Sequence, residues 1–319
     1  MNNINNKIIV ILGPTASGKS SVAIKLAKKF NGEIISSDSR QIYRGMEINS
    51  GAVPVSPINA QATHTTNRNF VYKTYALNGD VPHYFIGITD PTEEYSVAKF
   101  KRQSEEVIAN ILKRKKVPII CGGTGFWIKA IVDNMIFPKV KPNWSLREKL
   151  SKESTEQLFD KLKKIDSERA KTIDRQNKVR LIRALEICEK LGKVPVINLS
   201  KKRNWEFLQI GIQREKENLR KRIKLNVKTR MKQGMIAEIK KLHSVLSWEK
   251  IESFGLSFKL IPQYLKGEIA SLKKLEEKIY LTEKNYAKRQ ITWFNKDKRI
   301  KWLSNYNSIE KEVSDYLRQ

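Results

Sequence analysis

The chain has 319 residues, 40% of them hydrophobic, so it is long enough to bury a substantial core and to form about two domains. A formal net charge of +29 and only two cysteines exclude an acidic protein and a disulfide framework. The apolar runs have the length of strands, and the N-terminus lacks the basic and apolar regions of a signal peptide. We therefore expect a cytoplasmic protein with no membrane partner.

The positive charge indicates a polyanionic partner, either nucleic acid or an acidic membrane surface, with nucleic acid as the main candidate. A coding bias toward lysine, asparagine and isoleucine is the alternative explanation, because it raises the charge without any partner. Arginines are fewer than lysines and more clustered, which makes them the more informative residues. The arginines of most interest are Arg180, Arg183, Arg220, Arg222 and Arg230.

The segment Lys7–Phe30 carries the strongest motif of the chain. Its apolar run, Ile8–Leu12, is typical of a strand buried on both faces, and a helical pattern ends the segment. Between them, residues Gly13–Ser20 (GPTASGKS, the phosphate loop) fit G-x-x-x-x-G-K-[ST] at every fixed position. The glycines let backbone amides approach an anion, Lys19 adds a charge, and the Ser20 hydroxyl is placed to bind Mg²⁺. The loop predicts a site for a di- or triphosphate compound.

Next along the chain, Glu33–Asp38 predicts a second strand that ends in polar residues. Ligands of open α/β sheets bind beyond the carboxyl ends of the strands, which places Asp38 on the same edge as the phosphate loop. The alternative is that Asp38 caps a turn. Residues Val53–Val81 are polar and predict a long loop or surface insertion, and Tyr84–Ile88 predicts a third strand.

A second strand–glycine–helix pattern follows. Ser96–Lys116 predicts an amphipathic helix, and Val117–Cys121 predicts a buried strand. The strand runs into Gly122–Gly125 (GGTG, the glycine turn), and Phe126–Val132 predicts another helix. Glycines after a strand are common, but beside a phosphate loop they indicate that the backbone approaches a ligand there.

The second half of the chain is mainly helical. Trp144–Leu191 shows only helical patterns, whereas Glu206–Ile212 returns to a strand pattern, which indicates that a helical block is inserted into the sheet. Helices dominate from Lys216 to about Asn295, and a short strand, Ile300–Leu303, precedes a final helix, Ile309–Leu317.

The predicted fold class is therefore α/β, with a P-loop NTPase-like parallel-sheet core and an inserted all-helical domain. We expect residues 1–142 and 200–319 to form the core with a helical C-terminal part. Residues 143–199 form the inserted domain, whose helices read as a lid.

A phosphate loop fits a nucleotide kinase, an NTPase, or a transferase with a diphosphate leaving group. The sequence IISSD is an imperfect match to the aspartate-ending strand that an NTPase needs. Five motifs occur in order: GPTASGKS, SSDSRQIYRGM, DP followed by YS, GGTGFW and AKRQITWF. Together they resemble the tRNA dimethylallyltransferase family over about Lys7–Phe294. Members of that family transfer a dimethylallyl group from its diphosphate to N6 of the adenosine next to the anticodon.

The resemblance implies a phosphate-loop α/β core whose inserted helical domain closes on tRNA, Mg²⁺ as cofactor held near Ser20, and a monomer. The implied partners are dimethylallyl diphosphate and the anticodon stem-loop of tRNA. The expected donor-binding residues are Gly13, Pro14, Thr15, Ala16, Ser17, Gly18, Lys19 and Ser20. The expected catalytic residues are Asp38, Thr15, Lys19 and Arg222. The expected tRNA contacts are Asp38, Ser39, Arg40, Gln41, Thr124, Arg147, Val179, Arg180, Leu181, Ile182 and Arg183.

These residue types fit the chemistry. The N6 amine is a poor nucleophile because its lone pair is delocalised into the ring, so the reaction depends on stabilising the departing diphosphate. Lys19, Arg222 and Mg²⁺ would supply that stabilisation, while Asp38 would take the amine proton as a general base, an effect of roughly 10²–10⁴-fold. The expected product is N6-(dimethylallyl)adenosine 37 in tRNAs that read U-initial codons.

Two alternatives differ in substrate or in class. A relative that prenylates free AMP, ADP or ATP would need no helical insertion and no strongly basic surface. A non-catalytic RNA-binding module with a vestigial phosphate loop would not need Lys19, Ser20 and Asp38, all of which are present.

Overall fold

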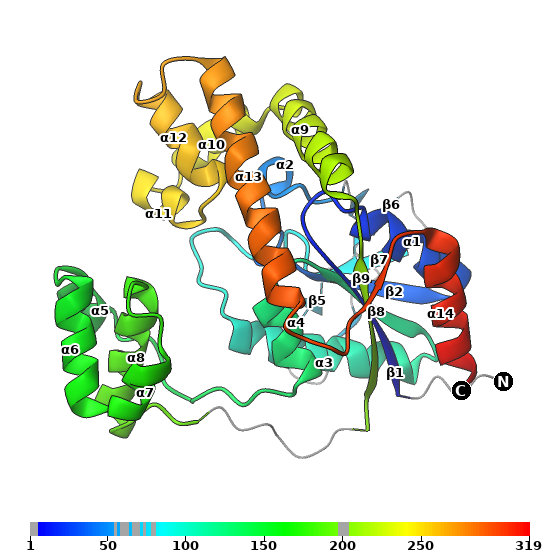
Figure 1. Cartoon of the computed structure of the whole chain (residues 1–319), viewed down its shortest axis with the longest axis horizontal. Coiled ribbons are helices and arrows are strands. Elements are labelled where there is room, and N and C mark those ends of the chain that lie inside the picture. The colour runs from blue at the N-terminus through cyan, green and yellow to red at the C-terminus, as the bar shows by residue number, and fades with distance from the viewer. Residues whose placement is uncertain are drawn as a thin grey trace. The chain divides into compact units, whose positions relative to one another are not determined.

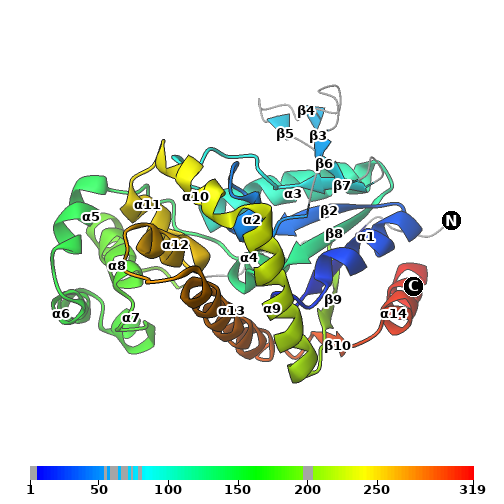
Figure 2. The ribbon, with the colours of Figure 1, turned by 90° about the horizontal axis from the view of Figure 1, so that it is seen from above.

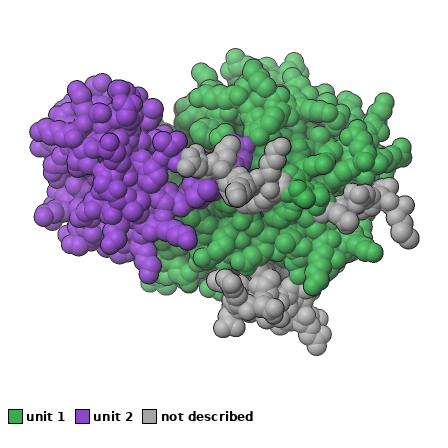
Figure 3. All heavy atoms as spheres, turned by 90° about the horizontal axis from the view of Figure 1, so that it is seen from below, with its two compact units in different colours: residues 1–132, 203–319 green, residues 133–202 purple. Residues whose placement is uncertain are grey.

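The computed structural model describes residues 6–53, 56–57, 64–65, 71–72, 75–77, 81–196 and 204–319. The chain divides into two compact units, which Figure 3 colours separately. Unit 1 comprises residues 1–132 and 203–319, and unit 2 comprises residues 133–202. The insertion expected at residues 143–199 lies within unit 2, which begins earlier in the chain.

Unit 1 contains a sheet of order β10-β9-β1-β8-β2-β7-β6-β3, whose strands are labelled in Figures 1 and 2. The strands from β10 to β7 are parallel, and β6 and β3 pair antiparallel at the edge. The parallel strands are β1 (Lys7–Leu12), β2 (Gly32–Ser37), β7 (Val81–Tyr84), β8 (Val117–Gly122), β9 (Glu206–Ile212) and β10 (Lys301–Leu303). This arrangement confirms the predicted α/β fold with a parallel-sheet core.

Strand β1 shows why the sheet is buried on both faces. All six of its residues are buried, and successive side chains point to opposite faces of the sheet. Ile8, Val10 and Leu12 enter one hydrophobic cluster, whereas Ile9 and Ile11 enter another. The unbroken apolar run thus serves two cores at once.

Helices cover both faces of the sheet (Figures 1 and 2). Helices α1 (Lys19–Lys29) and α14 (Tyr306–Arg318) bury apolar side chains in the cluster of Ile9. The cluster of Ile8 receives side chains from most of the other helices. These include α3 (Val97–Lys113), α4 (Gly125–Val132), α9 (Lys216–Gln233), α10 (Met235–His243), α11 (Trp248–Ser253), α12 (Ser257–Leu265) and α13 (Leu272–Phe294). A short helix, α2 (Glu47–Ser50), follows β2.

One prediction in the first half of the chain was wrong, and a second, a long loop or surface insertion at Val53–Val81, is tested only in part. The third strand, expected at Tyr84–Ile88, is β7 at Val81–Tyr84, and the chain turns at Phe85, which has a positive φ of 66°. The long loop expected at Val53–Val81 contributes strands where it is described. These are β3 (Ser56–Pro57) and β6 (Tyr75–Leu77) at the sheet edge, and the separate pair β4 (His64–Thr65) and β5 (Val71–Tyr72). The rest of that segment lies outside the described residues.

Unit 2 contains four helices and no strand among its described residues. They are α5 (Trp144–Ser151), α6 (Thr155–Ile165), α7 (Ser167–Thr172) and α8 (Lys178–Leu191). Each begins at a side chain that accepts a backbone N–H, which stabilises a helix by about 1 kcal/mol. The capping residues are Asn143, Ser154, Asp166 and Asn177. The unit has its own apolar core, which includes Leu158, Leu162 and Leu181.

Candidate active site

A cavity of about 980 Å³ lies in unit 1 where β1, β2 and β8 end. Parallel strands direct their carboxyl ends to one edge of the sheet, so the segments that follow them meet there. The cavity is lined by the phosphate loop, by residues after β2, by the glycine turn and by helices α9 and α13. Its lining includes Thr15, Ala16, Gly18, Lys19, Ser20, Asp38, Arg40, Gln41, Gly123, Arg222, Tyr286 and Gln290.

Part of the phosphate loop faces this cavity. Of the eight residues predicted to bind the donor, Gly13, Pro14 and Ser17 are absent from the lining among the described residues. Gly13 has a φ of 143° and would place a Cβ 3.3 Å from the backbone of Ile212, so it allows close packing against β9. Ser17 is fully buried, and its hydroxyl has no hydrogen-bond partner among the described residues. Gly13 and Ser17 therefore serve the packing of the loop.

Lys19 is turned toward its own loop. Its Nζ donates to the carbonyl of Pro14 at 2.7 Å. Burial lowers the pKa of Lys19, and the negative charge of Asp38 opposes that shift. Lys19 and Asp38 both line the cavity. Burial raises the pKa of Cys121 to about 11, so this thiol stays protonated near neutral pH.

Two arginines flank the phosphate loop. Arg222 donates its Nε–H to the Ala16 carbonyl at 2.7 Å, and Arg214 donates to the Ser17 carbonyl at 2.9 Å. A Cβ on Gly18 would lie 3.5 Å from an Nη2 atom of each arginine. Arg222 was predicted to face the diphosphate, whereas Arg214 was missed. Its position directly after β9, at the same sheet edge, was the available signal.

Asp38 follows β2 and lines the cavity. Its Oδ1 accepts the backbone N–H of Arg40 at 3.0 Å, so it also caps a turn, which was the alternative interpretation. The Arg40 guanidinium donates to the carbonyl of Phe254 at 2.8 Å and lies 5.3 Å from the ring centre of Tyr286. Burial and the charge of Asp38 raise the pKa of Tyr286. Gln41 also lines the cavity, beside the Asp38 turn.

The glycine turn packs against the end of β2. A Cβ on Gly122 would lie 2.1 Å from the Ser37 carbonyl oxygen, so no larger residue fits without backbone movement. Thr124 donates its N–H to that carbonyl at 3.2 Å, and its Oγ1 accepts the N–H of Ser39 at 3.2 Å. Neither Ser39 nor Thr124 is part of the lining of the described cavity.

Comparison with known proteins follows this geometry. Residues 41–297 match the family described as IPP transferase. The chain belongs to the IPP transferase family. It is 38% identical to a tRNA dimethylallyltransferase of Halothermothrix orenii, over 98% of this chain and 93% of that protein. It is 36% identical to tRNA dimethylallyltransferase 1 of Geotalea uraniireducens, over 98% and 97%.

Solved structures of the IPP transferase family share the fold. A tRNA isopentenylpyrophosphate transferase from Bacillus halodurans has a TM-score of 0.66 and 30% identity, covering 98% of this chain and 95% of that one. A eukaryotic dimethylallyltransferase, described as acting on tRNA, has a TM-score of 0.74 and 25% identity, covering 98% and 77%. Every helix in the described ranges of this chain is too short or too polar to cross a membrane.

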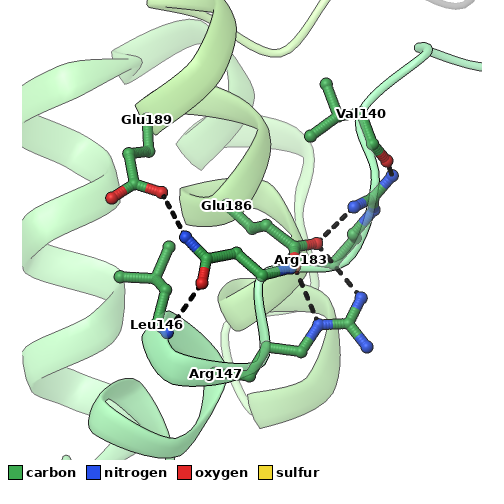
Figure 4. Close-up of polar contacts among 7 residues, drawn as sticks. Val140, Leu146, Arg147, Arg183, Glu186 and Glu189 are labelled. Atoms are coloured by element: carbon green, nitrogen blue, oxygen red, sulfur yellow. Dashed lines mark hydrogen bonds and ion pairs between the residues drawn. The ribbon is translucent and has the colours of Figure 1, made fainter.

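In unit 2 of this IPP transferase, two of the arginines expected to contact tRNA share one buried carboxylate (Figure 4). Glu186, 1% exposed, accepts from Arg147 at 2.9 and 3.1 Å, from the N–H of Asn143 at 2.6 Å, and from Arg183. Burial opposes its negative charge, but these hydrogen bonds lower its pKa. Arg183 also donates to the Val140 carbonyl at 2.9 Å. Both arginines therefore hold the unit together, whatever else they contact.

The segment Val179–Arg183 is divided between surface and core. Val179 is 77% exposed and Arg180 is exposed, whereas Leu181 is fully buried among the apolar side chains of unit 2. The side chain of Leu181 faces the core, so its expected tRNA contact stays a prediction for the segment as a whole. Ile182 is half-buried and packs against that core.

Ser20 is the residue expected to hold the magnesium ion. Mg²⁺ takes oxygen ligands and keeps several waters or substrate phosphate oxygens. Ser20 brings a hydroxyl to the cavity, and the described residues contain no cluster of three His, Cys, Asp or Glu side chains. These residues fit an ion held mainly by a diphosphate and water, with one hydroxyl ligand from the chain.

Proposed function

We propose that this chain is a prenyl transferase that moves a dimethylallyl group from dimethylallyl diphosphate to N6 of adenosine 37 in tRNAs reading U-initial codons. The products are N6-(dimethylallyl)adenosine and diphosphate. The observation that carries the proposal is that the phosphate loop, with Lys19, and Asp38 line one cavity. The names of the relatives in the IPP transferase family support the choice of substrates.

The donor binds with its diphosphate on the part of the phosphate loop that faces the cavity. Thr15, Lys19 and Ser20 supply polar groups from the loop, and Arg222 supplies a guanidinium from α9. These donors are fixed before the reaction, so they stabilise the charge that develops on the departing diphosphate without reorganisation. Mg²⁺ bound at Ser20 would add a positive charge to the same oxygens.

The acceptor adenine enters the cavity from its stacked position in RNA, at a cost of about a few kcal/mol. Its N6 forms a bond to carbon 1 of the dimethylallyl group while the bond from that carbon to the diphosphate oxygen breaks. Asp38 then takes the proton that the N6 amine loses. Its Oδ1 is held by the Arg40 N–H, and Asp38 lines the same cavity as the phosphate loop.

We place the RNA-contacting surface of unit 2 at the exposed start of α8. Val179 and Arg180 are exposed there, and Arg147 and Arg183 keep about a quarter and a third of their side chains exposed. In unit 1, Ser39 and Thr124 hold the turn beside Asp38, while Arg40 and Gln41 line the cavity. Phosphate contacts from arginines would position the RNA without reading its sequence.

A labelled-donor experiment tests the proposal. The chain is incubated with labelled dimethylallyl diphosphate, Mg²⁺ and unmodified tRNA, with AMP and ATP as competitors. Label in the RNA at the adenosine next to the anticodon is the expected result. Label in the free nucleotides, or in no product, would refute the proposed function.

A further inference from the structure

Gln290 joins the two glycine-rich segments of the candidate active site. It lies on α13, is 6% exposed, and lines the cavity. Its Oε1 accepts the backbone N–H of Thr15 at 2.8 Å, and its Nε2 donates to the carbonyl of Gly123 at 2.9 Å. Because one partner can only donate and the other can only accept, the orientation of the side-chain amide is fixed.

The surroundings of Gln290 leave little freedom for this bridge. A Cβ on Gly123 would lie 2.3 Å from the Gln290 Nε2, and a Cβ on Gly125 would lie 2.2 Å from the ring of Trp293, one helical turn further along α13. The glycine turn therefore lacks side chains where α13 presses against it. Buried polar groups that lose their partner cost more than a surface hydrogen bond, so the bridge constrains both segments.

The bridge belongs to a longer series of contacts. Thr124 follows Gly123, and its Oγ1 accepts the N–H of Ser39. Ser39 in turn follows Asp38. The series thus runs from the phosphate loop through Gln290 and the glycine turn to the segment that carries the carboxylate. No other residue described here hydrogen-bonds both the loop and the turn through its side chain.

We propose that Gln290 is a positioning residue that couples the phosphate loop to the glycine turn and to the Asp38 segment. The inference deepens the proposed function, on which its kinetic part rests. Because the Thr15 amide is held by Gln290, the diphosphate relies on Lys19 and on amides nearer the start of α1. A loop shifted by lost bonds would move carbon 1 of the donor relative to Asp38, and small misplacements reduce rates strongly.

Two substitutions separate the roles of this side chain. Gln290→Met keeps the volume and removes both hydrogen bonds. Gln290→Glu keeps an acceptor for the Thr15 N–H. When ionised, however, it cannot donate to the Gly123 carbonyl and repels that oxygen. The matched control is Gln103→Met, because Gln103 is also 6% exposed and bonded, here to Tyr95 on the segment before α3. Gln103 is absent from the cavity lining.

Amide hydrogen exchange is measured with and without Mg²⁺ and inorganic diphosphate as the probe. In the parent chain, we expect diphosphate to slow exchange in both the phosphate loop and the glycine turn. In Gln290→Met, we expect the loop to exchange about tenfold faster without diphosphate, and the turn to lose its response. Gln290→Glu should protect the loop better than Gln290→Met. A turn that still responds fully in Gln290→Met would overturn the proposal.

Kinetics give the second readout. We expect Gln290→Met to lower kcat by about 10- to 100-fold, and Gln103→Met to leave kcat within about twofold. Equal losses in the two variants would show a general packing effect and overturn the positioning role. If the glycine turn responds to diphosphate through Gln290 but the chain prenylates no tRNA, the proposed function is refuted and the coupling by Gln290 stands. Failure of the proposed function can therefore be distinguished from failure of the coupling.

Discussion

Asp38→Asn tests the general-base role most directly. The substitution keeps the size of the side chain and an oxygen that accepts the Arg40 N–H, so the turn after β2 survives. It removes the negative charge that takes the proton from N6. General-base catalysis contributes roughly 10²–10⁴-fold, which corresponds to about 3–5 kcal/mol of transition-state stabilisation. We therefore expect kcat to fall by that factor while the affinities for donor and tRNA change little.

The assay is single-turnover transfer of labelled dimethylallyl to tRNA, with the dissociation constants of donor and RNA measured separately. The matched control is Asp297→Asn, because Asp297 accepts the Arg299 N–H at 3.0 Å in a turn of the same kind and is absent from the cavity lining. Its rate should stay within about twofold of the parent. A single-turnover rate in Asp38→Asn equal to that of the control would refute Asp38 as the base.

Three further predictions address the loop, unit 2 and the sheet. Arg222→Met should weaken donor binding about 10- to 100-fold in calorimetry with unchanged tRNA affinity, because charge-assisted bonds contribute about 1.5–3 kcal/mol; unchanged donor affinity would contradict this. Arg180→Ala should lower the salt slope of tRNA binding by about 1 without affecting stability, whereas Leu181→Ala should lower the free energy of unfolding by about 2–5 kcal/mol. Glu33 is 2% exposed, and although burial opposes its charge, hydrogen bonds from Arg114, Lys116 and Tyr84 lower its pKa to about 2. That stabilisation, about 3 kcal/mol, is complete above pH 4.5 and lost as pH falls toward 2, so urea unfolding across this window should show a slope that Glu33→Gln lacks.

The local sequence pattern predicted an element correctly where the pattern follows directly from the burial of its side chains. The run Ile8–Leu12 is typical of a strand buried on both faces and forms one, and Gly13 after it packs closely against the backbone of β9. The third strand was predicted too late in the chain because Tyr84–Ile88 is apolar throughout. The chain turns at Phe85 instead, and this turn depends on a backbone conformation that the pattern of side chains does not encode.

The candidate site was predictable where one motif carries it and not where distant segments meet. Gln290 was missed as a site residue because its partners lie 275 and 167 residues away in the sequence. Arg214 was missed for the same reason. The burial of Leu181 was not foreseen for another reason: a motif carried over as a continuous block ignores the helical period, which turns one residue in three or four toward the core.

The shared carboxylate of Glu186 changes how the basicity of unit 2 should be counted. Arg147 and Arg183 bring two positive charges, and Glu186 cancels one of them from inside the fold. A polyanion approaching this cluster meets one elementary charge on a rigid frame, with little side-chain disorder left to lose. A count of the arginines alone therefore overstates the attraction here, while the fixed geometry would restrict where a bound phosphate group could sit.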